Sequence, residues 1–86
     1  MEPTYTPLQG QYLAFIHHYT ILNGRAPAEV DMQQFFRVTP PSVHSMVLKL
    51  EQLEFISRVP GQARSIALKI APESLPALHS RSSITR

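Results

Sequence analysis

The side chains that could do acid, base or nucleophilic chemistry are few in this sequence and do not form a catalytic pattern. Serine and histidine come together only at Ser42, His44 and Ser45, in a stretch whose apolar positions repeat with the period of a helix. A helix offers this group no third residue to orient the histidine and no glycine-rich turn to stabilise an oxyanion. We therefore expect that the protein is not an enzyme.

The sequence is equally poor in metal-ligating patterns. His17 and His18 are neighbours, which point about 100° apart on a helix, and no second ligand stands three or four residues away. The chain contains no cysteine, which excludes disulfide scaffolds, thiolate zinc sites and iron–sulfur clusters and favours a reducing compartment. We therefore predict no metal and no cofactor, and the sequence implies no small-molecule ligand.

Length and composition favour one small domain. A chain of 86 residues can bury only one modest core, which excludes an enzyme with separate cofactor and substrate domains. No run approaches the roughly 18 uninterrupted apolar residues of a membrane span. Residues 1–6 carry no basic segment that leads into an apolar stretch. We expect a soluble, cytoplasmic protein without a membrane partner.

The formal net charge of +2 is unevenly distributed along the chain. Residues 1–36 sum to −2, residues 37–70 to +3 and residues 71–86 to +1. The basic residues of the middle stretch are Arg37, Lys49, Arg58, Arg64 and Lys69. This asymmetry is compatible with an anionic partner for the second half of the chain.

The spacing of apolar residues predicts three helices, over residues 6–23, 28–37 and 41–54. Thr6 can cap the first helix, and Gly24 can end it in a left-handed conformation. The second helix starts at an alanine, which has no side-chain oxygen to cap it. The third follows a break that contains two prolines.

After the third helix the apolar period changes to that of a strand. Residues 55–59 and 64–70 are predicted as two strands joined by a turn at residues 60–63, and such a hairpin needs helices to pack on. We expect residues 1–5 to be flexible. Residues 71–86 are rich in proline and serine, so we expect them to be mostly disordered apart from one short turn.

Three helices followed by a two-stranded β-hairpin, within residues 6–70, are the element order of an α+β winged helix-turn-helix. In that architecture the helix after the turn enters the major groove of DNA. The hairpin, or wing, lies along the backbone or in the adjacent minor groove. The prediction assigns residues 41–54 to the recognition helix and residues 55–70 to the wing.

Individual residues make this prediction more specific. The first helix opens with Thr6 and Gln9, and Pro27 precedes the second helix. The most specific part is the wing, where residues 55–58 read Phe-Ile-Ser-Arg and residues 60–68 read Pro-Gly-Gln-Ala-Arg-Ser-Ile-Ala-Leu. On these residues the chain resembles the amino-terminal DNA-binding domain of the LexA repressor family and small stand-alone regulators built like it, over about three quarters of its length.

The resemblance implies a small bacterial transcription regulator that binds double-stranded DNA sequence-specifically. It places base contacts on the first two turns of the third helix and phosphate contacts nearby and in the wing. For each of these residues the alternative is an ordinary solvated side chain, or for Thr39 a helix cap. The expected DNA contacts are Thr39, Ser42, His44, Ser45, Lys49, Arg58, Gln62 and Arg64.

Several features depart from the family's pattern. The glycine usual in the helix-turn-helix turn is Arg37 here, so the turn either follows another backbone path or holds arginine at a costly positive φ. The glycine usual near the end of the third helix is Glu54. Pro40 and Pro41 remove two backbone donors from the entry of the third helix. The sequence ends before the protease and dimerisation domain of the full repressor, so self-cleavage is not expected.

Two alternatives stay open from the sequence. The first is a winged-helix module that binds another protein instead of DNA, because the third helix is polar and weakly basic. The second concerns the oligomeric state, since paired half-sites are how small domains reach useful specificity. For a homodimer, the ends of the first helix together with Leu75 and Leu78 are the candidate contact.

Overall fold

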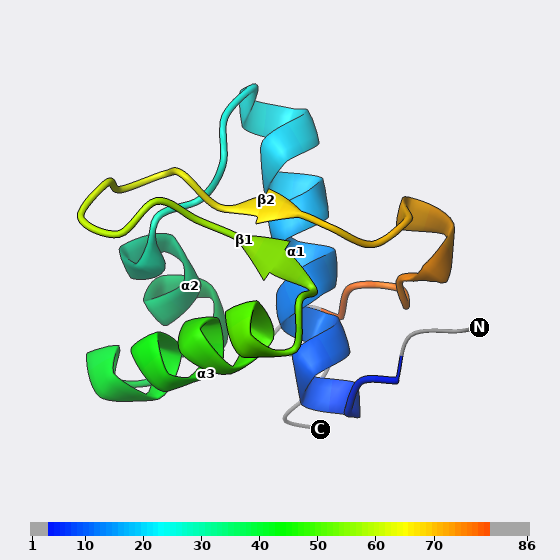
Figure 1. The fold of residues 1–86 in the computed structure, drawn as a ribbon, viewed down its shortest axis with the longest axis horizontal. Helices are drawn as coiled ribbons and strands as arrows, with labels where there is room; N and C mark the ends of the chain where they lie inside the picture. The colour runs from blue at the N-terminus through cyan, green and yellow to red at the C-terminus, as the bar shows by residue number, and fades with distance from the viewer. Residues whose placement is uncertain (1–3, 80–86) are drawn as a thin grey trace.

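Three helices followed by a small antiparallel sheet make up residues 4–79, the part of the chain that the structure, a computed structural model, describes (Figure 1). The two strands pair with Ile56 opposite Leu68. This arrangement confirms the predicted α+β fold of the winged-helix kind. The elements are α1 (Pro7–Asn23), α2 (Glu29–Phe36), α3 (Pro40–Gln52), β1 (Ile56–Ser57), β2 (Ala67–Leu68) and a short 3₁₀ helix, η1 (Pro72–Ser74).

Local chemistry explains both ends of α1. The Oγ1 atom of Thr6 accepts the N–H of Gln9 at 3.1 Å, and the Oε1 atom of Gln9 accepts the N–H of Thr6 at 3.0 Å. This reciprocal pair is a capping box. Pro7 follows in the first turn, and Gly24 ends the helix with φ at +70°. The predicted boundaries of this helix are therefore correct to within one residue.

The starts of α2 and α3 differ in how they are capped. Ala28 has no side-chain cap to offer, as predicted, but its N–H donates to the Oδ2 atom of Asp31 at 2.8 Å. At α3 the Oγ1 atom of Thr39 accepts the N–H of Ser42 at 3.4 Å, with Pro40 in the first helical position. Thr39 is therefore a helix cap, and α3 starts one residue earlier than predicted.

The two positions where the family's pattern has glycine keep a glycine-like backbone. Arg37, at the end of α2, has φ at +56°, and Glu54, before β1, has φ at +65°. Of the two paths open for Arg37, the structure therefore shows the left-handed one. A Cβ atom in this region is strained against the following carbonyl group.

Arg37→Gly and Glu54→Gly are each expected to stabilise the protein by about 0.5–1 kcal/mol, because relief of the strain exceeds the extra chain entropy of glycine in the unfolded state. For a domain of this size the melting temperature should rise by roughly 2–8 °C. His18→Gly, at an exposed position inside α1, is the control and should lower it. Melting temperatures that fall in both test variants would contradict the left-handed backbone.

All three helices and both strands contribute to one core. The rings of Tyr12 and Phe36 stack with centroids 4.2 Å apart and join α1 to α2. Burial raises the pKa of the Tyr12 phenol. Leu22, which helical spacing places on the inner face, is exposed because the last turn of α1 extends beyond the core. The most deeply buried side chains are Leu13, Ile16, Met32, Val43, Val47, Leu50 and Ile56.

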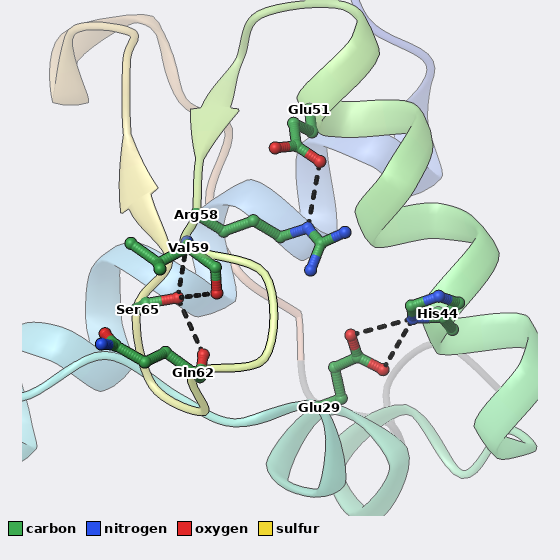
Figure 2. A network of polar contacts seen from close by, with 7 residues as sticks. All are labelled: Glu29, His44, Glu51, Arg58, Val59, Gln62 and Ser65. Atoms are coloured by element: carbon green, nitrogen blue, oxygen red, sulfur yellow. Dashed lines mark hydrogen bonds and ion pairs between the residues drawn. The ribbon is translucent and has the colours of Figure 1, made fainter.

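The wing contains less sheet than predicted, with two residues in each strand instead of five and seven. Gly61 and Arg64 have φ at +80° and +61°, which turn the chain away from strand geometry. The Ser65 side chain takes the place of the missing backbone hydrogen bonds between the strands. Its Oγ atom accepts the N–H of Val59 at 2.9 Å. The same hydroxyl donates to the carbonyl oxygen of Gln62 at 2.9 Å (Figure 2). The tip is thus an ordered loop.

Residues 71–79 lie against α1. Leu75 and Leu78 are half-buried and pack on the core, and the Nε2 atom of Gln11 donates to the carbonyl oxygen of Ala77 at 2.9 Å. The two leucines offered above as a homodimer contact are therefore engaged within the domain.

The two ends of the chain extend beyond this description. Residues 1–3 and 80–86, which include parts of the segments predicted to be flexible or disordered, lie outside the described residues. Within residues 4–79, no helix has the length and apolar character needed to cross a membrane.

Candidate nucleic-acid interface

The outer face of α3 gathers half of the expected contact residues. The opposite face is fixed by Val43, Val47 and Leu50, which are fully buried. The other positions of the helix are exposed, apart from Met46 and Glu51, which are half-buried. The expected contacts on this exposed face are Ser42, His44, Ser45 and Lys49.

The side chains on one edge of this face line a shallow depression. Ser42, Ser45 and Lys49 lie there beside Gln9 of α1. The hydroxyl of Ser42 is 2.9 Å from the Oγ1 atom of Thr39, so the start of α3 presents two adjacent hydroxyl groups. Among the described residues, Ser45 and Lys49 have no side-chain hydrogen bond or ion pair within the protein. Their polar groups are thus available to a ligand.

His44 lies on the other edge of the face, next to α2 and the wing. Its Nδ1 atom is 3.1 Å from the Oε2 atom and 3.3 Å from the Oε1 atom of Glu29, the first residue of α2 (Figure 2). About half of the imidazole remains exposed, at 53 %. The ring is therefore held on one side and open on the other.

Arg58 leaves the wing and reaches back to α3. Its Nε atom donates to the Oε1 atom of Glu51 at 3.0 Å, and its side chain is 18 % exposed (Figure 2). Its two terminal nitrogens have no hydrogen-bond partner among the described residues. Arg58 lines a cleft together with Glu29, His44 and the wing tip, which includes the exposed Gln62. Arg58 thus offers two donors to a ligand.

Arg64 is held by other elements of the domain, although its side chain stays 30 % exposed. Its Nη1 atom donates to the hydroxyl of Tyr19 at 3.1 Å, to the carbonyl oxygen of Ala26 at 3.2 Å and to the Oδ2 atom of Asp31 at 3.0 Å. The hydrogen bond to Tyr19 and the charge of Asp31 raise the pKa of the guanidinium. Arg64 therefore joins the wing to α1, to the following loop and to α2.

Sequence reasoning missed four residues of this surface. Leu48 is 42 % exposed on the outer face of α3, and the spacing of its buried neighbours could have identified it. Arg37 is exposed in the helix-turn-helix turn, and no described acid pairs with it. Glu29 and Glu51 hold His44 and Arg58 across 15 and 7 residues of chain. No local pattern in the sequence indicates those two pairings.

The geometry suits a polyanion better than a metal ion or a buried substrate. Within residues 4–79, no three histidine, aspartate or glutamate side chains come together as metal ligands would. The exposed polar face of α3 and the adjacent wing form one open surface. Helices and hairpins of this kind fit the grooves and phosphates of a duplex.

Comparison with known proteins finds relatives for most of the chain. No protein-family model matches. The chain is similar to the LexA repressor of Thermosipho africanus (strain TCF52B), with 39 % identity over 70 residues. It is also similar to the LexA repressor of Thermosipho melanesiensis (strain DSM 12029 / CIP 104789 / BI429), with 37 % identity over 70 residues.

In each comparison the match covers 81 % of this chain and 35 % of the relative, so the chain spans about a third of the length of the repressors that it matches. The sequence similarity to these repressors is consistent with the winged-helix fold, because 70 matched residues are enough to contain all three helices and the wing. The resemblance to the LexA repressor family predicted from the sequence is confirmed, and the similarity is consistent with a LexA amino-terminal DNA-binding domain.

Proposed function

We propose that this chain is a sequence-specific, double-stranded DNA-binding domain of a cytoplasmic bacterial transcription regulator, with α3 in the major groove and the wing on the backbone or in the minor groove. The similarity to two LexA repressors supports a DNA-binding regulator in general. The observation that carries the finer proposal is the exposed polar face of α3, on which Ser45 and Lys49 have no partner among the described residues.

Each side chain of this face has a role that suits its chemistry. Ser42, His44 and Ser45 can donate and accept hydrogen bonds at base edges. Leu48, which is exposed one turn further along, contacts a thymine methyl group. Lys49 neutralises a phosphate. In this arrangement the helix reads bases from its first turn to Leu48 and is anchored by the charge of Lys49 in its third turn.

The wing contributes through Arg58 and its tip. The Nε atom of Arg58 is engaged with Glu51, which orients the two remaining nitrogens toward a phosphate or a narrow minor groove. Gln62 is exposed at the tip, where Gly61 permits a close approach of the backbone. Arg64, which is bound within the protein, positions the wing and makes no phosphate contact.

A titration of duplex DNA at several salt concentrations tests this proposal. About three to five phosphate contacts should make the logarithm of the binding constant fall with the logarithm of salt at a slope between about −2.7 and −4.5. Duplexes selected from a random pool supply the specific sequence. Absence of binding at low salt, by a protein shown to be folded, would refute the function.

Arg58→Ala and Arg64→Ala are expected to weaken binding in two different ways. Arg58→Ala removes a phosphate contact, so the salt slope should become shallower by about 0.9. Arg64→Ala frees the wing from Tyr19 and Asp31, so affinity should fall while the slope stays unchanged. Each variant is the control for the other in the same titration. Equal slopes for both variants would contradict these assignments.

A second candidate, a winged-helix module that binds a protein, is favoured by one observation. The acids Glu29, Glu51 and Asp31 pair with His44, Arg58 and Arg64, which lowers the positive charge of the surface. This candidate predicts no measurable duplex binding by the wild type or by Lys49→Ala. The DNA-binding proposal predicts measurable binding that Lys49→Ala weakens.

A further part of the proposal is that the functional form is a homodimer. Since Leu75 and Leu78 pack within the domain, the contact falls on the exposed end of α1, where Ile21 and Leu22 are 64 % and 82 % exposed. Sedimentation at high protein concentration tests it. A monomer at all concentrations, with and without duplex DNA, would contradict it.

A further inference from the structure

The pairing of His44 with Glu29 stands out on the proposed base-reading face. Both oxygens of the carboxylate lie near one ring atom, at 3.1 and 3.3 Å from Nδ1. The two residues come from different helices, α3 and α2, so the contact depends on the tertiary fold. Figure 2 shows the imidazole and the carboxylate facing each other at the edge of the cleft between α3, α2 and the wing.

The other charged groups of this cleft are already engaged. Arg58 donates to Glu51, and Arg64 donates to Asp31. Among the described residues, Glu29 is the only acid within hydrogen-bond distance of the His44 ring, and no cation shares that carboxylate. Glu29 is therefore the partner that holds the Nδ1 atom of the ring.

A carboxylate at Nδ1 determines what the opposite nitrogen can do. Nδ1 must carry a hydrogen to bond the carboxylate, so in the neutral ring the lone pair lies on Nε2. Nε2 then accepts a hydrogen bond. When the ring is protonated, Nδ1 keeps its bond and Nε2 becomes a donor.

These two roles correspond to different bases in the major groove. An acceptor pairs with the amino group of cytosine or adenine, whereas a donor pairs with O6 or N7 of guanine, N7 of adenine or O4 of thymine. Cytosine presents only a donor and guanine only acceptors, so these two bases distinguish the two states of the ring most sharply. The His44 side chain is 53 % exposed, and its Nε2 atom has no hydrogen-bond partner among the described residues, so Nε2 is available to a base edge.

We propose that Glu29 is a positioning residue that fixes the tautomer of His44 and makes His44 a pH-dependent reader of one base pair. The neutral ring favours cytosine over guanine, and the protonated ring favours guanine over cytosine. This inference rests on the proposed DNA-binding function. It goes beyond it by assigning a specificity-determining role to an acid that touches no base.

The tautomer is tested first, in the free protein. Nitrogen-15 spectra of the imidazole should show hydrogen on Nδ1 of His44 at about pH 8, well above the pKa of an ordinary histidine near 6.5. Glu29→Ala should abolish this preference. Glu73→Ala, which removes the same charge from an exposed position of η1 outside the proposed interface, should preserve it. Hydrogen on Nε2 in the wild type, or the same tautomer in Glu29→Ala, would overturn the inference.

The base preference is tested next, with duplexes that differ at one position. Between about pH 8 and about pH 5.5, the preference for guanine over cytosine should rise by about fivefold in the wild type and in Glu73→Ala. It should be lost in His44→Ala and reduced in Glu29→Ala. Loss of a negative charge alone would raise the affinity for all duplexes equally.

The possible outcomes distinguish the role of His44 and Glu29 from the proposed DNA-binding function. Duplex binding with the same base preference at both pH values would overturn the inference and leave the proposed function standing. A free protein with the expected tautomer that binds no duplex would refute the proposed function and, with it, the reading role of His44.

Discussion

Ser45→Glu is expected to abolish specific duplex binding without unfolding the protein. Ser45 is exposed near the middle of α3 and has no partner among the described residues. A carboxylate there would face the phosphates and base acceptors of the major groove, and such like-charge contacts cost several kcal/mol. We expect the dissociation constant to rise by roughly 100-fold or more, which corresponds to about 2.7 kcal/mol. The helix itself tolerates glutamate, which is a better helix former than serine.

Fluorescence anisotropy with a selected duplex measures the affinity, and a thermal melt checks the fold. His18→Glu adds the same charge at an exposed position of α1, outside the proposed interface, and should have a small effect. Ser45→Ala, which removes one hydroxyl, should cost less than Ser45→Glu. An affinity for Ser45→Glu within a few-fold of the wild type would exclude α3 from the major groove.

Phe36→Ala is expected to cause the largest loss of stability among these variants. Truncation of a buried phenylalanine costs about 3–5 kcal/mol, and a domain of this size has roughly 4–13 kcal/mol in total. The ring centroid of Phe36 lies 4.2 Å from that of Tyr12, 5.8 Å from that of Phe15 and 4.9 Å from that of Phe35. Its removal therefore loosens the contact of α2 with α1.

Thermal and urea unfolding measure this loss, and the melting temperature should fall by at least roughly 12 °C. Phe35→Ala is the matched control, because Phe35 is only half-buried and should cost less. Phe36→Leu, which keeps most of the volume, should also cost less. Equal destabilisation by Phe36→Ala and Phe35→Ala would contradict the central place of Phe36 in the core.

The helices were predictable because their determinants are local. The capping box of Thr6 and Gln9 spans three residues, and the left-handed end at Gly24 requires one. The strands were predicted too long for the same reason. Alternating side chains indicate an extended chain, but the ladder between β1 and β2 is interrupted by the hydrogen bonds of Ser65 and the left-handed Arg64, which depend on the folded loop.

The candidate site was predictable in part. The outward positions of Ser42, His44, Ser45 and Lys49 follow from the period of the buried residues. The orientation of Arg58 and Arg64 in the wing could not be predicted from the sequence. It depends on acids of other elements and, for Arg64, on a positive φ that the residue type does not reveal. The sequence treats Arg58 and Arg64 alike as DNA contacts, whereas in the folded protein Arg64 has more hydrogen-bond partners within the domain than Arg58.

The anchored wing has a consequence for the entropy of DNA binding. A hairpin with two paired residues in each strand would be loose by itself. Arg64 fastens it to three separate segments through Tyr19, Ala26 and Asp31, so the wing loses its conformational freedom during folding and not during association. A preorganised ligand-binding element binds more tightly than a mobile one with the same contacts. In this way Arg64 contributes to affinity through its contacts within the protein, because they order the wing before DNA arrives.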